Sequence, residues 1–182
     1  HSLRHLSVGA ESFIPVEPPT NFHLYNVYGP TECTIFTTAY PIRQFERNAL
    51  IGKPLDSFRL YVVDQEGRQV NVGQEGELWI SGPQVARGYL NRPEQNAQAF
   101  TPNPFCQDPP YDRVYHTGDI VRWLPDGNLQ FVGRRDGQVK IRGFRIELKE
   151  VESIIREFPG IKDATVHAFD VDDGEHQSSG GL

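Results

Sequence analysis

Glycine and proline interrupt this chain so often that only short helices and strands fit between them. The 182 residues include 17 glycines and 14 prolines, the residues that most often mark turns and loops. Short apolar runs recur between them, most regularly after residue 51. Such spacing predicts many short strands in a small barrel or sandwich-like sheet and argues against a helical bundle.

Hydrophobic periodicity places the individual elements. Strands are expected over residues 3–8, 22–27, 58–63, 76–82, 119–124, 129–132, 139–141 and 161–169. Residues 32–40 predict a short turn of helix followed by a strand, and a second short helix is expected to start over residues 91–94. Residues 147–158 carry apolar side chains at helical spacing and predict an amphipathic helix.

Composition excludes several classes of function. The formal net charge is −6 with no Lys/Arg run, which argues against a nucleic-acid partner. No stretch approaches the ~18 apolar residues of a membrane helix, so no membrane is expected. Cys33 and Cys106 form no CxxC pair, so we expect no disulfide or metal framework and a reducing compartment, the cytoplasm. The sequence contains no methionine, and we expect it to be part of a longer protein.

The strand expected over residues 22–27 leads into the motif Tyr28-Gly29-Pro30-Thr31-Glu32. Gly29 permits a tight turn and close approach to a ligand, and Tyr28 offers a flat face to a base. Thr31 can donate to a phosphate oxygen, and Glu32 is the kind of carboxylate that holds magnesium together with phosphates. The alternative is an ordinary strand-to-helix turn with a capping threonine.

Three further polar positions each allow two interpretations. Asp119, just before an expected strand, can accept hydrogen bonds from a ribose diol or can cap its own turn. Arg134 can hold phosphate or ribose oxygens or can be a solvated surface residue. Lys140 and Arg142 can meet an anionic substrate or can cover an exposed sheet edge.

Taken together in order, five motifs resemble a known family. They are Tyr28-Gly29-Pro30-Thr31-Glu32, the run 76–82, the run 85–90, Tyr115-His116-Thr117-Gly118-Asp119, and Gly133-Arg134 with the run 138–147. The sequence closely resembles, over about residues 3–169, the adenylation domain of non-ribosomal peptide synthetases. That domain belongs to the adenylate-forming superfamily, together with acyl-CoA synthetases and luciferases.

The resemblance implies an α/β core fragment with a β-barrel-like part, a hinge, and the start of a small α+β carboxyl-terminal subdomain. Residues 1–135 would be the end of the large core, divided into a sheet end (1–41) and a β-rich barrel part (42–135). Residues 136–182 would be the truncated small subdomain.

The resemblance also implies a reaction. An amino acid and ATP, with Mg²⁺, would form an aminoacyl adenylate and pyrophosphate. The aminoacyl group would then pass to the phosphopantetheine thiol of a peptidyl carrier protein, with condensation domains as further partners in the parent synthetase.

Residue roles follow by motif position from the resemblance. For the nucleotide, Asn26 would meet the adenine amino group, Tyr28 would pack on the ring beside Gly29, Asp119 would accept the ribose diol, and Phe131 and Arg134 would line the site. Thr31 would contact the α-phosphate and Glu32 would bind Mg²⁺, so that Thr31, Glu32 and Lys140 carry the catalytic roles.

The remaining roles concern the amino acid and the domain movement. The side-chain pocket would be lined by Val27, Ile35, Phe36, Ser7 and Gly9. Asp136 would be the hinge, and Lys140, Arg142 and Gly143 would lie in the loop used for thioester formation.

The family's Ser/Thr/Gly-rich phosphate loop, its pocket aspartate and its late catalytic lysine have no match in this sequence. We therefore expect the isolated chain to be a poor enzyme or none. Three alternatives stay open: an acyl- or aryl-CoA ligase of the same superfamily, a non-catalytic remnant acting as an interaction module, and an unrelated β-rich binding domain.

Overall fold

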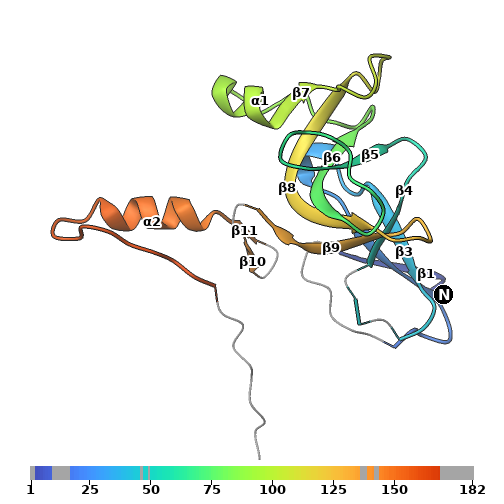
Figure 1. The fold of residues 1–182 in the computed structure, drawn as a ribbon. Coiled ribbons are helices and arrows are strands. Elements are labelled where there is room, and N and C mark those ends of the chain that lie inside the picture. Colours follow the sequence, from blue (N-terminus) through green and yellow to red (C-terminus); the bar gives the residue numbers. More distant parts are fainter. Residues whose placement is uncertain are drawn as a thin grey trace, which may run out of the picture.

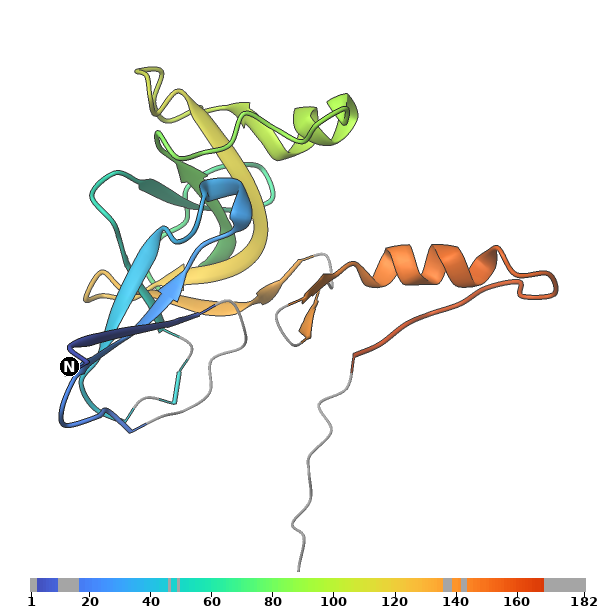
Figure 2. The ribbon, with the colours of Figure 1, turned by 180° about the vertical axis from the view of Figure 1, so that it is seen from behind.

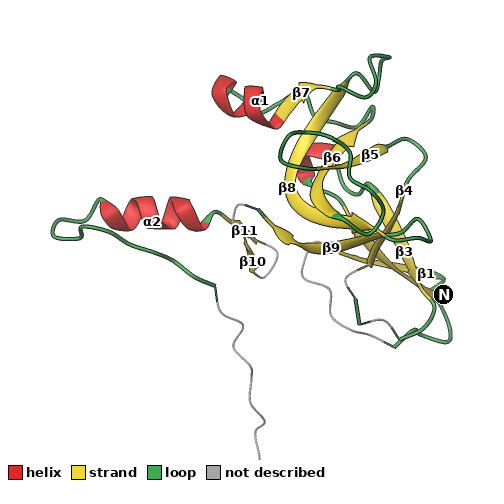
Figure 3. Cartoon of the chain, viewed as in Figure 1, coloured by secondary structure: helices red, strands yellow, loops and turns green. Residues whose placement is uncertain are grey.

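The computed structural model describes residues 3–9, 17–45, 47–48, 50–135, 139–141 and 144–168. Strands dominate this part of the chain, as Figure 3 shows. The elements in chain order are β1 (His5–Gly9), β2 (His23–Tyr28), η1 (Thr31–Cys33), β3 (Thr38–Ile42), β4 (Leu50–Pro54), β5 (Arg59–Val63), β6 (Glu75–Ser81), α1 (Pro93–Ala99), β7 (Phe100–Pro102), β8 (Arg113–Trp123), β9 (Leu129–Arg134), β10 (Val139–Ile141), β11 (Phe144–Ile146) and α2 (Leu148–Arg156).

Within the described residues, β1 to β9 form one sheet in the order β1-β2-β3-β4-β9-β8-β6-β5, with β7 paired to β8. β1 and β2 are parallel, and every other pair is antiparallel. β10 and β11 form a separate antiparallel hairpin. The long strand β8 curves through the middle of the sheet (Figure 1).

The predicted barrel-like part is wrong, because the sheet is open. β4 joins the first strands to β9, so the sheet end and the β-rich part are continuous. After β5 the chain turns back and lies along the outer edge of the same strand. There the Val70 amide donates to the Val62 carbonyl, and the Asp64 amide donates to the Arg68 carbonyl. With that edge occupied, β5 does not reach β1, and the sheet does not close.

The predictions for the helices and short strands are confirmed in type, with two exceptions. Residues 161–168 form no strand, although their apolar pattern is typical of one, because among the described residues no partner strand lies beside them. Asp119 lies inside β8 rather than before a strand. Gly118, at φ +71°, lets β8 bulge there and continue.

The main core lies on one face of the curved sheet. Its fully buried side chains include Val62, Leu78, Ile80, Val121 and Leu129, from β5, β6, β8 and β9. Alternating inward side chains on neighbouring strands explain this cluster. It fixes the relative positions of β6, β8 and β9, whose polar residues face the site described below.

The amphipathic helix α2 projects away from the large sheet in both views (Figures 1 and 2). Its apolar side chains Val151 and Ile154 are exposed, as is Phe158 just after it. In the described part of the chain, no helix is both long enough and apolar enough to cross a lipid bilayer.

Candidate functional site

The loop after β2 is shaped by close backbone packing. A Cβ on Gly29 would lie 2.3 Å from the Cα of Phe36, so glycine is required there by space. The Thr37 amide donates to the Tyr28 carbonyl at 2.7 Å and closes the loop. Thr34 has φ +81°, a strained conformation for a β-branched residue. The short helix η1 between these contacts turns Glu32 inward, where only 7% of it is exposed.

Asp119 is the centre of a polar contact between three strands. The Arg134 guanidinium lies 2.5 Å from Asp119 Oδ1, with only 8% of the aspartate side chain and 15% of the arginine side chain exposed. The Tyr28 hydroxyl donates to the other oxygen, Oδ2. The structure therefore joins Tyr28, Asp119 and Arg134, which are separated by up to 106 residues in the sequence.

The pKa of Tyr28 is shifted mainly by burial of the phenol and, to a smaller extent, by the neighbouring carboxylate. Desolvation, followed by the negative charge of Asp119, raises the pKa of Tyr28 well above its ordinary value. The phenol is therefore neutral and available as a hydrogen-bond donor at neutral pH.

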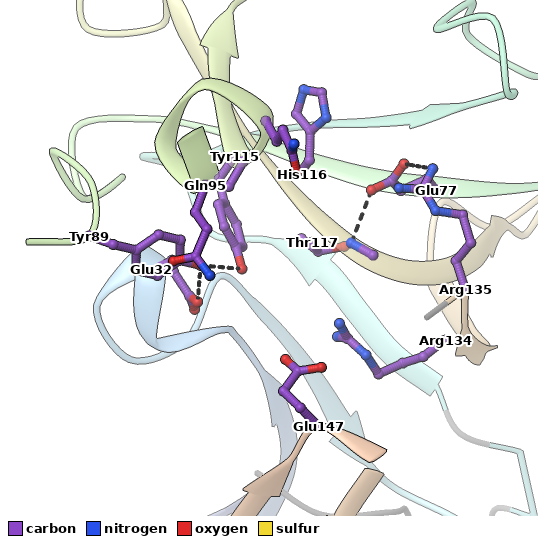
Figure 4. Close-up of a pocket in the computed structure, with 13 residues that line it drawn as sticks. Glu32, Glu77, Tyr89, Gln95, Tyr115, His116, Thr117, Arg134, Arg135 and Glu147 are labelled. Atoms are coloured by element: carbon purple, nitrogen blue, oxygen red, sulfur yellow. Dashed lines mark hydrogen bonds and ion pairs between the residues drawn. The ribbon is translucent and has the colours of Figure 1, made fainter. Parts of the chain in front are cut away.

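A second polar contact surrounds Glu32. The Tyr89 hydroxyl donates to Glu32 Oε1 at 2.6 Å and lies 3.5 Å from the Tyr115 hydroxyl. Figure 4 shows the ends of these two tyrosine side chains gathered at the glutamate.

Both contacts border one pocket of roughly 460 Å³, lined by Glu32, Glu77, Tyr89, Tyr115, His116, Arg134, Arg135 and Glu147 among others. Arg134 and Glu147 point toward each other across it in Figure 4. Carboxylates and guanidinium groups in one hollow can hold a polar, anionic ligand together with a cation.

On the far wall of the pocket, β6 and β8 share a buried carboxylate. Glu77 accepts from the Gly118 amide at 3.0 Å and from Arg135 Nη1 at 2.9 Å. Both carboxylate oxygens of Glu77 are thus engaged, and the Gly118 amide beside Asp119 is held in place. Glu77 therefore supports the bulge that carries Asp119.

His116 lines the same pocket but is held by packing. Its ring stacks on Trp79 with centroids 4.0 Å apart, and its Nε2 lies 2.8 Å from the Thr101 hydroxyl. Burial lowers the pKa of His116 below its ordinary value, so the ring is neutral at neutral pH.

The remaining predicted nucleotide residues lie on β2, η1 and β9, and their roles stay predictions. Asn26 is buried and donates from Nδ2 to the Leu50 carbonyl at 2.7 Å, which ties β2 to β4. Phe131 packs against the main core, as does Tyr28. Thr31 is exposed and is not among the lining residues.

The predicted amino-acid pocket is not part of this hollow. Ile35 is 70% exposed and Phe36 38% exposed, while Ser7 and Gly9 pair with Tyr25 and Val27 between β1 and β2. The predicted lining residues therefore lie on β1, on β2 and in the loop before β3, and their role stays a prediction.

The predicted hinge and thioester loop fall mostly outside the described residues. Asp136, Arg142 and Gly143 lie outside them, and Lys140 is placed on β10 by its backbone alone.

The pocket residues that sequence reasoning missed include Glu77, Tyr89, Tyr115, Arg135 and Glu147. These five lie within or next to the five motifs that carried the resemblance, whereas Gln95, Gln98 and Ala99, which also line the pocket, lie outside them. Motif membership was the available signal, but local sequence does not reveal which side chain in a motif faces the site.

The thiol of Cys33, next to the site, offers a test of how its burial affects stability at high pH. Desolvation, then the Glu32 charge, raises the pKa of the Cys33 thiol to about 12 from its ordinary value of 9.0. Between pH 9 and 12 the unfolded chain loses this proton and the folded chain keeps it, so the free energy of unfolding falls as pH rises. At pH 10 the expected loss is about 1 kcal/mol, since one pKa unit corresponds to about 1.4 kcal/mol.

Urea unfolding of the 182-residue chain at pH 8 and pH 10 measures this loss. Cys33→Ala removes the thiol, so its stability should fall less between the two pH values. An equal fall in both proteins would contradict the burial argument.

The chain matches a family model described as "AMP-binding enzyme" over residues 2–90. It is 43% identical over 181 residues to tyrocidine synthase 3 of Brevibacillus parabrevis, covering 96% of this chain and 3% of that protein. It is 43% identical to surfactin synthase subunit 1 of Bacillus subtilis (strain 168), covering 91% of this chain and 5% of that protein. The chain belongs to the AMP-binding enzyme family. Its similarity lies with the adenylation domains of non-ribosomal peptide synthetases, and it spans a small part of each of these relatives.

Solved structures agree with this membership of the AMP-binding family. The chain superimposes on PA1221, "an NRPS protein containing adenylation and PCP domains", with a TM-score of 0.74 and 31% identity. That match covers 88% of this chain and 34% of PA1221. The crystal structure of IdnL1 gives a TM-score of 0.76 at 27% identity, with 89% of this chain and 35% of IdnL1 covered. The fold is thus that of one part of an adenylation domain.

Proposed function

We propose that this chain supplies the nucleotide-contacting part of an amino-acid-activating adenylation domain. The observation that carries the proposal is the contact of Tyr28, Asp119 and Arg134 beside the pocket that Arg134 and Glu32 both line. An acceptor, a fixed cation and a flat aromatic ring are what a ribose, a phosphate and a base require. These groups come from separate strands, so the fold assembles them.

In this proposal each residue has one task. Asp119 accepts hydrogen bonds from the ribose hydroxyls, and Tyr28 holds the Asp119 carboxylate while its ring packs on the base. Arg134 donates to ribose or phosphate oxygens. Positioning of this kind lowers the barrier to attack of a carboxylate on the α-phosphate, because the reacting groups are already oriented.

The donor set fits magnesium held jointly with phosphates. Glu32 brings a carboxylate to the pocket, at the loop that follows β2. Among the described residues, no three His, Cys, Asp or Glu side chains gather into a metal site, and magnesium in nucleotide sites is commonly held by one or two carboxylates plus phosphates. When bound there, Mg²⁺ would draw negative charge from the phosphate oxygens.

The second half of the proposed reaction is transfer of the aminoacyl group to the phosphopantetheine thiol of a peptidyl carrier protein. It is supported by the solved relatives that contain adenylation and PCP domains. Lys140, Arg142 and Gly143 would serve this step and Asp136 the movement between the two steps. The chain spans about a third of those relatives, so we propose that the complete reaction belongs to a longer adenylation domain.

The test is Mg²⁺-dependent binding of ATP by the 182-residue chain, measured by calorimetric titration with and without Mg²⁺. Glu32→Gln removes the proposed ligand charge. It should reduce the gain in affinity that Mg²⁺ brings by at least about tenfold, since even an outer-shell change costs 10–100-fold in metal affinity. Glu66→Gln, at an exposed carboxylate paired with Arg68, is the matched control and should keep the full gain.

Absence of any Mg²⁺-dependent binding by the unaltered chain would overturn the proposal and favour a non-catalytic interaction module. The substrate class needs a separate measurement. Pyrophosphate exchange by the longer adenylation domain with amino acids, and none with fatty acids, is the expected result. The reverse would favour an acyl-CoA ligase of the same superfamily.

A further inference from the structure

Tyr89 is anchored at its backbone by a single side chain of α1. The Tyr89 amide donates to Asn96 Oδ1 at 2.6 Å, and Asn96 Nδ2 donates to the Tyr89 carbonyl at 2.8 Å. These two hydrogen bonds join one side-chain amide to both the backbone amide and the backbone carbonyl of Tyr89, and so they fix the position of the Tyr89 Cα. It holds a segment that otherwise runs as irregular chain between β6 and α1.

The residue before Tyr89 leaves room for the Asn96 side chain that makes these two hydrogen bonds. Gly88 has φ +142°, and a Cβ there would lie 2.8 Å from Asn96 Oδ1. Any side chain at position 88 would therefore crowd the amide and require a backbone conformation that favours glycine. Gly88 and Asn96 act together to set the direction in which Tyr89 leaves the backbone.

The Tyr89 side chain then spans the distance to Glu32. Its ring meets Phe100 edge to face, with centroids 5.4 Å apart and an interplanar angle of 66°, a favourable aromatic geometry. Its hydroxyl donates to Glu32 Oε1 at 2.6 Å. The backbone of the same segment also reaches this glutamate, since the Ala86 amide donates to the Glu32 carbonyl at 2.7 Å.

We propose that Tyr89 is a positioning residue that orients the Glu32 carboxylate and thereby sets how tightly Mg²⁺ binds with the nucleotide. The inference rests on the proposed function, in which Glu32 is the metal ligand. A carboxylate held by a neutral donor at one oxygen keeps its charge and loses rotational freedom. Such partners of metal ligands typically change metal affinity 10–100-fold when removed.

Tyr89→Phe tests the proposal because it removes the hydroxyl and keeps the ring against Phe100. ATP is titrated into the 182-residue chain without Mg²⁺, and Mg²⁺ is then titrated into the chain with ATP. The Mg²⁺ concentration at half-saturation should rise by about tenfold, while the Mg²⁺-free affinity for ATP stays within about twofold. A purely structural loss would lower both affinities together.

Tyr61→Phe is the matched control. Its hydroxyl is also in a buried contact, accepting from Asn103 Nδ2 at 3.1 Å, outside the pocket. It should leave the Mg²⁺ half-saturation unchanged. A double-mutant cycle adds a second readout: in the Glu32→Gln background, Tyr89→Phe should have no further effect on Mg²⁺ binding, because the two residues act as a unit.

An unchanged half-saturation in Tyr89→Phe, with normal Mg²⁺-dependent binding by the unaltered chain, would overturn this inference and leave the proposed function standing. Equal effects of Tyr89→Phe in the unaltered chain and in the Glu32→Gln variant would also overturn it. No Mg²⁺-dependent binding by the unaltered chain would overturn the proposed function and this inference with it.

Discussion

Replacing Asp119 with alanine is expected to lower the free energy of unfolding by about 3 kcal/mol, because removing one partner of a buried ion pair takes a close counter-charge from the partner that stays buried. Arg134 would lose its 2.5 Å contact while 85% of its side chain stays covered. The Tyr28 hydroxyl would lose its acceptor at the same time. Two partners are therefore affected by a single truncation.

The same substitution should abolish detectable ATP binding, since Asp119 is the proposed acceptor for the ribose hydroxyls. Urea unfolding gives the change in stability, and calorimetric titration gives the change in binding. The matched control is Glu75→Ala, which breaks the contact with Arg122 at 3.6 Å between side chains that are 49% and 36% exposed. Exposed pairs contribute at most about 1 kcal/mol, and this pair lies outside the pocket. Equal losses of stability in the two variants would contradict the buried contact at Asp119.

Replacing Gly29 with alanine is expected to cost about 3 kcal/mol, at the upper end of the range for overpacking. The added Cβ would lie 2.3 Å from the Phe36 Cα and 2.7 Å from the Ile35 carbonyl oxygen. Both are backbone atoms, so no side chain can rotate away. The loop would have to open, and Tyr28 on one side and Glu32 on the other would both move.

Gly133→Ala is the control for Gly29→Ala. Nothing lies within 4 Å of a Cβ at position 133, and alanine reduces the freedom of the unfolded chain, so the expected effect is between none and a gain of about 1 kcal/mol. Thermal or urea unfolding distinguishes the two. A loss below about 1 kcal/mol at Gly29 would show that the loop is less tightly closed than its contacts imply.

Local sequence predicted well those elements that depend on local chemistry. The strand before Tyr28, the short helix at Glu32 and the amphipathic helix α2 were each expected and each occur. The apolar run, the Gly29-Pro30 break and the helical spacing are all readable within a few residues. The resemblance assigned Asp119 and Arg134 to one nucleotide site. The structure brings the two side chains into contact, and their roles toward the nucleotide stay predictions.

Features that depend on distant partners could not be predicted in this way. Thr117-Gly118-Asp119 reads as a turn, yet pairing with β6 and β9 carries β8 straight through it. The sheet stays open because the outer edge of β5 is occupied by the chain that returns after its own turn. Glu77 and Tyr89 are separated from Arg135 and Glu32 by 58 and 57 residues, and no local pattern indicates such a pair.

Backbone amide shifts of the 182-residue chain on addition of Mg–ATP test most directly whether one nucleotide site unites the ends of β2 and β9 with the middle of β8. The largest shifts should fall at Tyr28, Gly29, Asp119 and Arg134, which lie far apart in sequence and together in the fold. Shifts confined to another face of the sheet, or none at a saturating nucleotide concentration, would contradict a shared nucleotide site at these residues.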